Sequence, residues 1–218
     1  MVIMFIMVTI LLLLLVVFRK ETTTLIDTFT NTNKNLKVVL IGDSMLNNSA
    51  YVSANQSVPD LLSKELVGNT VYNFAKDGST INDCYAQLDK ISTDLNNSSI
   101  FIIVSCGGNN ILSSRSLKKT DMNNLFNEYS KLLESIKTRV PNASVYVLNL
   151  YTPTNSHYVS YHSAINQWNQ LLEDNKSSLD YTIIDTSSLL VTDKDFTYNI
   201  EPSEKGGAKI VKAILNNI

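Results

Sequence analysis

The sequence predicts one α/β domain, a three-layer α/β/α sandwich around a flavodoxin-like parallel sheet of five strands. Short, apolar, β-branched runs alternate along the chain with longer stretches of helical periodicity. The runs are continuously apolar, as in strands whose two faces are both covered. Helices of this length between such strands imply βαβ units and a parallel sheet. A chain of 218 residues suits one such domain with a substantial core.

Each element has its own signal. The predicted strands cover residues 36–42, 70–75, 99–106, 144–150 and 181–185. The predicted helices cover residues 57–68, 80–91, 121–139 and 161–174, and a last helix begins near Pro202. Ser57, followed by proline in the first turn, is typical of a helix start, and Gly68 of a helix end. No repeat appears at any period.

The N-terminus differs from this domain. Residues 1–18 are uncharged and about long enough to span a bilayer core, and bulky residues end the run. We therefore favour an uncleaved transmembrane anchor over a cleaved signal segment. Residues 19–35 form a polar tether, and residues 36–218 form the domain. Arg19 and Lys20, on the domain side of the apolar segment, favour a cytoplasmic domain. Apolar N-terminal segments usually export the chain that follows them, and N-x-S/T sequons also fit export. The side of the membrane on which the domain lies therefore stays open.

Composition excludes several function classes. The formal net charge of −2 gives no basic field for nucleic acid. The histidines, thiols and acids show no zinc or iron spacing, and no nucleotide-binding loop is present, so we expect neither metal nor cofactor. Cys106 ends an apolar run and is predicted to be a small buried residue, Cys84 lies in a predicted helix, and a bridge between the two is the less favoured alternative.

The loops after the strands carry the candidate site, because ligands of open α/β sheets bind at the carboxyl ends of the strands. Ser44 follows the first strand beside a glycine and is placed as a nucleophile, although a serine there is also a common helix cap. Gly78 follows the second strand, where a backbone N–H can approach a ligand. Asn109 follows the third strand, and its amide is a donor for an oxyanion.

These three blocks resemble those of the SGNH hydrolases, the GDSL esterase and lipase superfamily. "IGDSM" resembles the nucleophile block, which implies that Ser44 is the nucleophile and an oxyanion donor. "NFAKDGST" and "GGNN" resemble the second and third blocks, which implies that Gly78 and Asn109 complete the oxyanion hole. Asn110 stands where the family usually has aspartate. Asn166 resembles a common family asparagine of lesser weight.

The last block departs from the family. Family members end in D-x-x-H-P, often with S-x-x-G after it, whereas this chain has "YNIEPSEKGG". In that register Tyr198 replaces the aspartate and Glu201 replaces the histidine. No histidine follows His162, so the difference is not an alignment slip.

A glutamate at this position should make ester hydrolysis slower than a histidine would. Free glutamate has a pKa of about 4.3, against about 6.5 for histidine. A carboxylate about 4 Å from a developing oxyanion costs about 4 kcal/mol at an effective dielectric of about 20, nearly three decades of rate. Activity could survive in three ways: burial could raise the pKa of Glu201, His157 or His162 could act as the base instead, or the oxyanion hole alone could give residual activity. We expect both histidines to be ordinary surface residues.

The sequence therefore favours an esterase for small, acetyl-like acyl groups, with Ser44, Gly78, Asn109 and Glu201 in its site. An inactive relative that binds an acylated glycan, lipid or protein is the alternative, and an acyltransferase is a third reading. The expected partners are a small acyl ester or acylated ligand and, through the N-terminal segment, a membrane. An inward Glu201 would favour the enzyme, and an outward Glu201 would favour the binding protein.

Overall fold

The structure, a computed structural model, describes residues 36–92, 95, 100–114 and 119–218. Residues Leu36–Ile218 form one compact unit. The predicted anchor and tether lie outside the described residues. Within those residues, no helix is both long enough and apolar enough to cross a bilayer.

A five-stranded parallel sheet forms the middle layer, in the order β2-β1-β3-β4-β5. This order is that of a flavodoxin-like sheet, so the predicted fold class is confirmed. The strands are β1 (Lys37–Gly42), β2 (Thr70–Asn73), β3 (Ile100–Ser105), β4 (Ser144–Leu148) and β5 (Thr182–Ile184). In β1, residues Val38–Ile41 are fully buried, as expected for a strand covered on both faces.

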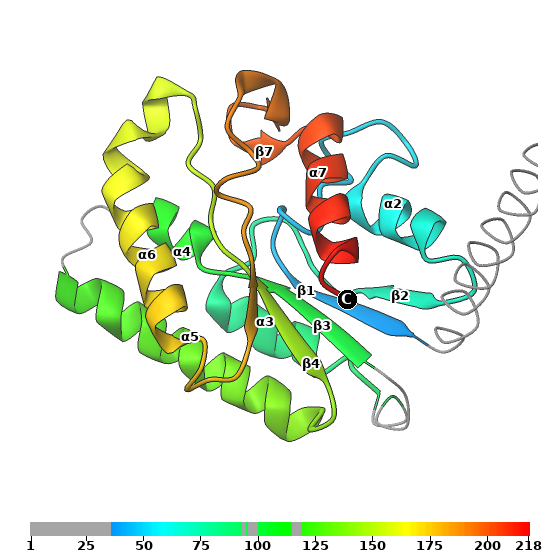
Figure 1. Cartoon of the computed structure of the whole chain (residues 1–218). Helices are drawn as coiled ribbons and strands as arrows, with labels where there is room; N and C mark the ends of the chain where they lie inside the picture. The colour runs from blue at the N-terminus through cyan, green and yellow to red at the C-terminus, as the bar shows by residue number, and fades with distance from the viewer. Residues whose placement is uncertain (1–35, 93–94, 96–99, 115–118) are drawn as a thin grey trace, which may run out of the picture. The chain divides into compact units, whose positions relative to one another are not determined.

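Helices cover the sheet in two outer layers (Figure 1). On one side α2 (Val58–Glu65) packs against α7 (Glu204–Leu215). On the other side α5 (Lys119–Arg139) lies between α3 (Ile81–Leu88) and α6 (His162–Asn175). The predicted cap is confirmed, because the Ser57 hydroxyl accepts a hydrogen bond from the Asp60 N–H at the start of α2.

Short elements at the carboxyl edge of the sheet were not predicted. They are α4 (Gly108–Ser113), η2 (Ser156–Tyr161), η3 (Asp193–Asp195), and the antiparallel pair β6 (Phe196–Thr197) and β7 (Glu201–Pro202). Residues 107–110, expected to form a loop, instead start α4. Gly107 makes this turn with a φ of 106°, and a Cβ there would lie 2.5 Å from the Trp168 ring. Only glycine fits between the turn and that indole.

The two cysteines differ from expectation. Cys84 in α3 and Cys106, just after β3, form a disulfide. Both cysteines are buried, as predicted for Cys106, and the bridge that the sequence left as the less favoured alternative is present. The parallel sheet places the start of the 107–110 turn beside α3, and sequence separation alone does not show this proximity. The bridge ties α3 to the strand that leads into α4.

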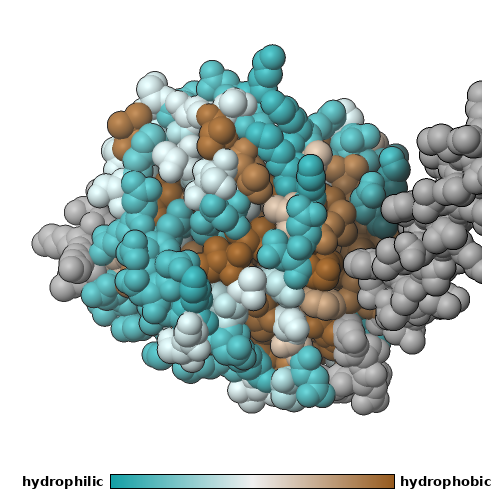
Figure 2. All heavy atoms as spheres, viewed as in Figure 1, coloured by the Kyte–Doolittle hydropathy of each residue, from teal (hydrophilic) through white to brown (hydrophobic). Residues whose placement is uncertain are grey.

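The face of the molecule seen in Figure 2 is mostly hydrophilic, with apolar atoms between the helices. Four large apolar residues are strongly exposed among the described residues: Val67, Val159, Val191 and Tyr198. They are scattered along the sequence, and single exposed apolar residues are normal for a soluble domain surface.

Candidate active site

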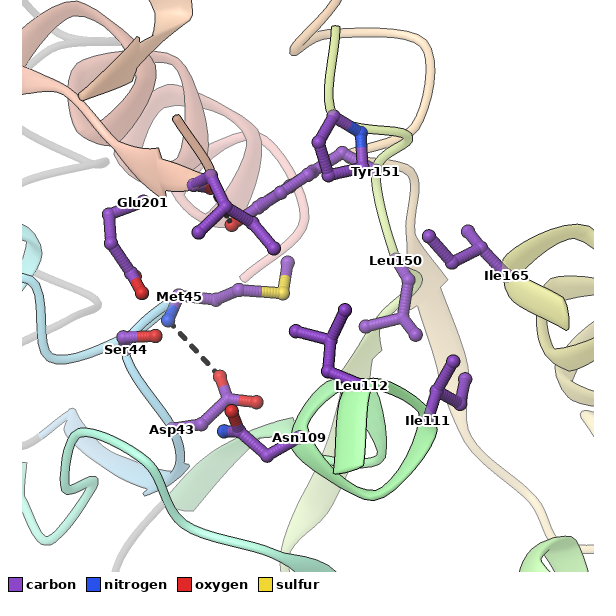
Figure 3. A pocket seen from close by; sticks show the side chains of 13 residues that line it. Asp43, Ser44, Met45, Asn109, Ile111, Leu112, Leu150, Tyr151, Ile165 and Glu201 are labelled. Atoms are coloured by element: carbon purple, nitrogen blue, oxygen red, sulfur yellow. Dashed lines mark hydrogen bonds between the residues drawn. The ribbon is translucent and has the colours of Figure 1, made fainter. Parts of the chain in front are cut away.

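A cavity opens at the carboxyl ends of β1, β3 and β4, and it holds about 480 Å³ including its open mouth. Its polar side chains are those of Asp43, Ser44, Asn109, Tyr151 and Glu201 (Figure 3). The remaining wall is largely apolar and includes Met45, Ile111, Leu112, Leu150, Ile165 and Ile200. Three of the four predicted site residues, Ser44, Asn109 and Glu201, therefore lie in one hollow.

Ser44 lies in a tight turn after β1 and not at a helix start. The N–H groups of Leu46 and Asn47 both donate to the Asp43 carbonyl and close this turn. Ser44 is 8% exposed and lines the cavity. Because no helix begins there, the helix-cap alternative does not account for this serine.

Gly42 fixes the path of the chain into this turn. Its φ is 144°, and a Cβ at this position would lie 2.0 Å from the carbonyl oxygen of Ser105 in β3. The next residue pairs with the same carbonyl, because the Asp43 N–H donates to it at 3.0 Å. A glycine is therefore needed for β1 to come close to β3 just before the nucleophile.

Asp43 is a buried carboxyl group behind Ser44. Its Oδ1 accepts hydrogen bonds from the Ser105 hydroxyl at 2.9 Å and the Met45 N–H at 3.1 Å. Burial outweighs these bonds and, with the nearby Glu201 charge, raises the pKa of Asp43 to about 7. Asp43 therefore holds the turn in shape while carrying a costly charge near neutral pH.

Asn109 lies in the first turn of α4, and its side chain reaches the loop after β2. Its Nδ2 donates to the Ser79 carbonyl at 3.0 Å, which fixes the amide and leaves one of its two N–H donors for a ligand. Gly78 is exposed and lines a neighbouring depression instead of the main cavity. The structure thus brings Asn109 to Ser44, but it leaves Gly78 outside the cavity wall.

Glu201 lies in β7 and turns inward. Its carboxylate points toward Ser44 (Figure 3). Burial, together with the charge of Asp77, raises the pKa of Glu201, and the nearby Ser44 hydroxyl acts in the opposite direction. Its Oε2 is buried and finds no hydrogen-bond partner among the described residues. Glu201 therefore occupies the expected position of a base but lacks an orienting partner for that oxygen.

The other candidates for the base system lie elsewhere. Tyr198 is 71% exposed and packs edge-on against Tyr51, so it does not orient Glu201 as an aspartate orients a histidine. His157 is exposed beside Tyr158. His162 bonds the Pro153 carbonyl through Nε2 at 3.1 Å. Neither histidine lines the cavity, as the sequence predicted.

Two buried amides that the sequence did not single out hold the site together. Gln87 accepts from the Gly42 N–H at 2.7 Å and donates to the Gly42 carbonyl at 2.9 Å and the Ser79 hydroxyl at 3.0 Å. Asn48 accepts from the Val58 N–H at 2.8 Å and donates to the Pro202 carbonyl at 3.1 Å. Because Pro202 follows Glu201, Asn48 connects the nucleophile loop to the segment carrying the candidate base.

Three further asparagines lie near the site but outside the cavity wall. Asn166 is exposed and lies outside the cavity wall. Asn169, one turn later, accepts from the Leu150 N–H at 2.8 Å and donates to the Leu150 carbonyl at 2.7 Å. Asn110, in the position of the family aspartate, accepts from the Ile81 N–H at 3.0 Å and thereby caps α3. No group of three metal-ligating side chains comes together in the described part of the chain.

The sequence profile of the GDSL-like lipase/acylhydrolase family matches residues 40–209. The chain belongs to this family. No curated protein matches its sequence significantly. The profile covers every block discussed above, including the altered last block.

Solved structures share the fold at low sequence identity. A member of the lipolytic G-D-S-L family from Veillonella parvula superposes with a TM-score of 0.69 at 16% identity, over 84% of this chain and 98% of that one. The acetyl xylan esterase AlAXEase gives 0.68 at 13%, over 84% and 99%. A phospholipase A1 from Streptomyces albidoflavus gives 0.63 at 13%, over 84% and 99%. At these identities the likeness establishes the fold and not the substrate.

Proposed function

We propose that this protein hydrolyses esters of short acyl groups, with Ser44 as nucleophile and Glu201 as general base. One observation carries the proposal: the Glu201 carboxylate is turned into the cavity, toward Ser44. An outward glutamate would have taken this proton acceptor out of the cavity. Asn109, held by Ser79, is the proposed side-chain donor to the oxyanion.

The proposed reaction has two halves. Ser44 Oγ attacks the acyl carbon and gives its proton to Glu201, and the carbonyl oxygen becomes an oxyanion that Asn109 and the Ser44 N–H stabilise. The intermediate collapses, the alcohol leaves with the proton from Glu201, and an acyl-serine remains. Water then attacks this ester while Glu201 takes its proton, and Glu201 gives that proton to Ser44 Oγ as the acyl–oxygen bond breaks and the carboxylic acid is released.

The environment of Glu201 offsets part of its handicap. A raised pKa brings the carboxylate closer to the basicity that a general base needs near neutral pH. Once Glu201 has taken the serine proton it is neutral, so its repulsion of the oxyanion ends as that anion forms. Glu201 gives no positive charge to the intermediate, and we therefore expect slower turnover than with histidine.

A catalytically inactive binding protein is the second candidate, and the altered last block supports it. Tyr198 faces outward, and Glu201 Oε2 has no partner among the described residues, so no side chain in this part of the chain bonds that oxygen as an aspartate bonds a catalytic histidine. Such a protein would keep the cavity to hold an acylated glycan, lipid or protein. An acyltransferase, in which an alcohol resolves the acyl-serine, would use the same first half-reaction.

Ester hydrolysis by the purified full chain tests the first candidate. We expect p-nitrophenyl acetate hydrolysis that Ser44→Ala lowers by at least about a thousandfold. Ser49→Ala is the matched control, because Ser49 is exposed and its hydroxyl bonds Asn47 in the same loop. Equal rates for Ser44→Ala and the unmodified protein would refute a serine nucleophile.

We further propose that residues 1–18 anchor the protein in a membrane, with the domain on the extracytoplasmic side. The length of the apolar run supports the anchor. The Cys84–Cys106 disulfide supports the side, because disulfides persist mainly in oxidising compartments. Protease digestion of intact cells tests both parts: we expect the domain to be cleaved from outside, and full protection would contradict this orientation.

A further inference from the structure

Asp43 is a buried carboxyl group with one oxygen free to meet a ligand. Its hydrogen bonds from the Ser105 hydroxyl, at 2.9 Å, and from the Met45 N–H, at 3.1 Å, both end on Oδ1. Oδ2 accepts no hydrogen bond from another described residue, and Figure 3 shows this second oxygen turned into the cavity. The mechanism above gives Oδ2 no role.

Oδ2 lies beside the proposed oxyanion donor. A Cβ built on Gly108 would be 3.8 Å from Oδ2, and Asn109 is the next residue of α4. Asp43 directly precedes Ser44 in the chain, and all four of these residues line the cavity. A carbonyl oxygen that reaches both the Asn109 amide and the Ser44 N–H is therefore placed near Oδ2 as well.

Burial favours the neutral form of this carboxyl group. Asp43 is 3% exposed, and no salt bridge joins it to a cation among the described residues. The titratable groups that face it are Glu201 in β7, Tyr129 in α5 and Tyr151 after β4, and none of them carries a positive charge. A buried carboxyl group without a cation holds its proton, in agreement with the pKa of about 7. Because Oδ1 already accepts two hydrogen bonds, the proton belongs on Oδ2.

The proposed reaction is short of donors at this point of the cavity. The Ser44 N–H and the Asn109 amide are two donors to the oxyanion, whereas Gly78, the predicted third, lies outside the cavity wall. Glu201 is neutral once it has taken the serine proton, so it gives the oxyanion no positive partner. A neutral acid beside Asn109 would supply the missing hydrogen bond.

We propose that Asp43 is a further catalytic residue: in its protonated form it donates a hydrogen bond from Oδ2 to the carbonyl oxygen of the ester, and its ionisation switches the site off. This inference rests on the proposed function and adds an upper pH limit to it. The proton stays on Asp43 throughout, so the step consumes no other reactant. Ionisation would remove the donor and place a negative charge next to the oxyanion, and both changes oppose the reaction.

The pH profile of p-nitrophenyl acetate hydrolysis by the full chain tests the proposal, after subtraction of the Ser44→Ala rate. We expect kcat/KM of the unmodified protein to fall at least about tenfold from pH 7 to pH 8.5. Asp43→Asn should keep its rate over this range, because its Oδ1 takes the two existing hydrogen bonds and its Nδ2 then donates into the cavity at every pH. Asp43→Val has neither donor nor charge and, with an unchanged circular dichroism spectrum, should be at least about tenfold slower than Asp43→Asn at pH 8.5. The same profile in Asp43→Asn and the unmodified protein, or equal rates for the two variants, would refute the proposal.

A substitution that keeps the carboxyl group gives a second test if the Asp43 variants do not fold. The Ser105 hydroxyl bonds Oδ1 and favours the ionised form of Asp43, so Ser105→Ala should move the fall in rate to higher pH. Ser113→Ala is the matched control, because Ser113 is exposed and its hydroxyl bonds the Asn110 carbonyl at 3.1 Å within α4. Identical profiles for Ser105→Ala and Ser113→Ala would contradict the role of Asp43.

Binding of ethylboronic acid separates this inference from the proposed function. The Ser44 hydroxyl can add to the boron atom and pass its proton to Glu201, which places a boron-bound oxygen where the oxyanion would lie and needs no turnover. If no ester is hydrolysed, but the affinity of the unmodified protein falls at least about tenfold relative to Asp43→Asn from pH 7 to pH 8.5, the role of Asp43 is confirmed and the esterase is refuted. Hydrolysis with the same pH dependence in both proteins would leave the esterase and refute the role of Asp43. Absence of both hydrolysis and binding would refute the two together.

Discussion

Replacing Asp43 by asparagine should stabilise the protein near neutral pH. Asp43 is 3% exposed, and burial raises its pKa from the ordinary 3.8 to about 7. At 1.36 kcal/mol for each pH unit, this difference corresponds to about 4 kcal/mol of destabilisation when the group is ionised. Asparagine can still accept, through Oδ1, the hydrogen bonds from Ser105 and Met45, so the variant loses the charge and keeps the turn.

The pH dependence follows from the direction of the shift. The folded state binds a proton more tightly than the unfolded state, so the free energy of unfolding should fall as the pH rises from about 4 to about 7. The Asp43→Asn variant lacks this decline. The two proteins should therefore be similar near pH 4 and differ by up to about 4 kcal/mol above pH 7, with the variant more stable.

Urea unfolding between pH 4 and 8 measures this difference. Asp185→Asn is the matched control, and its effect on stability should have the opposite sign. Burial acts to raise the Asp185 pKa, but hydrogen bonds from Ser187 and Asn149 hold it at about 2. Removing that charge should therefore destabilise the protein above about pH 4. Parallel stability curves for Asp43→Asn and the unmodified protein would refute the reasoning about the buried carboxyl.

Three further predictions concern single contacts. Gly42→Ala should lower the free energy of unfolding by more than about 3 kcal/mol, because the added Cβ would lie 2.0 Å from a carbonyl oxygen of β3. Gly68→Ala meets open space and should lower it by only about 1 to 2 kcal/mol. Urea unfolding of both variants checks this difference. Replacing Cys84 and Cys106 by serine opens a loop with a sequence separation of 22 and should lower the unfolding free energy by about 3 kcal/mol, and an unchanged value would contradict the bridge. Tyr151→Phe removes a 2.8 Å hydrogen bond to the carbonyl just before the candidate base, so esterase kinetics should show kcat falling more than KM rises.

The sheet and its main helices were predictable because their signals are local. β1 is a continuous apolar run, and α2 carries its own serine cap and first-turn proline. The candidate residues Ser44, Asn109 and Glu201 were predictable because they directly follow strands or match family blocks. In a parallel sheet the strand ends meet at one edge, so sequence order is enough to bring Ser44 and Asn109 together.

The remaining features depend on contacts between distant segments. α4 begins with one glycine and two asparagines, which are poor helix formers, and the packing of the preceding Gly107 against Trp168 shapes its entry. The inward turn of Glu201 depends on its neighbours: Pro202 is held by Asn48, and the preceding carbonyl by Tyr151. The disulfide likewise requires α3 to lie beside the end of β3. None of these pairings has a signature within its own stretch of sequence.

The pH dependence of p-nitrophenyl acetate hydrolysis by the unmodified protein, Glu201→Gln and Glu201→His tests the central claim most directly. We expect the rate of the unmodified protein to rise with pH through an apparent pKa above the ordinary glutamate value of 4.5, because only the carboxylate accepts the Ser44 proton. The Glu201→Gln variant should hydrolyse the ester about 10² to 10⁴ times more slowly, and its rate should no longer rise with pH in this way. An inert unmodified protein, with turnover gained only in Glu201→His, would contradict the account and leave a binding protein that has lost its base.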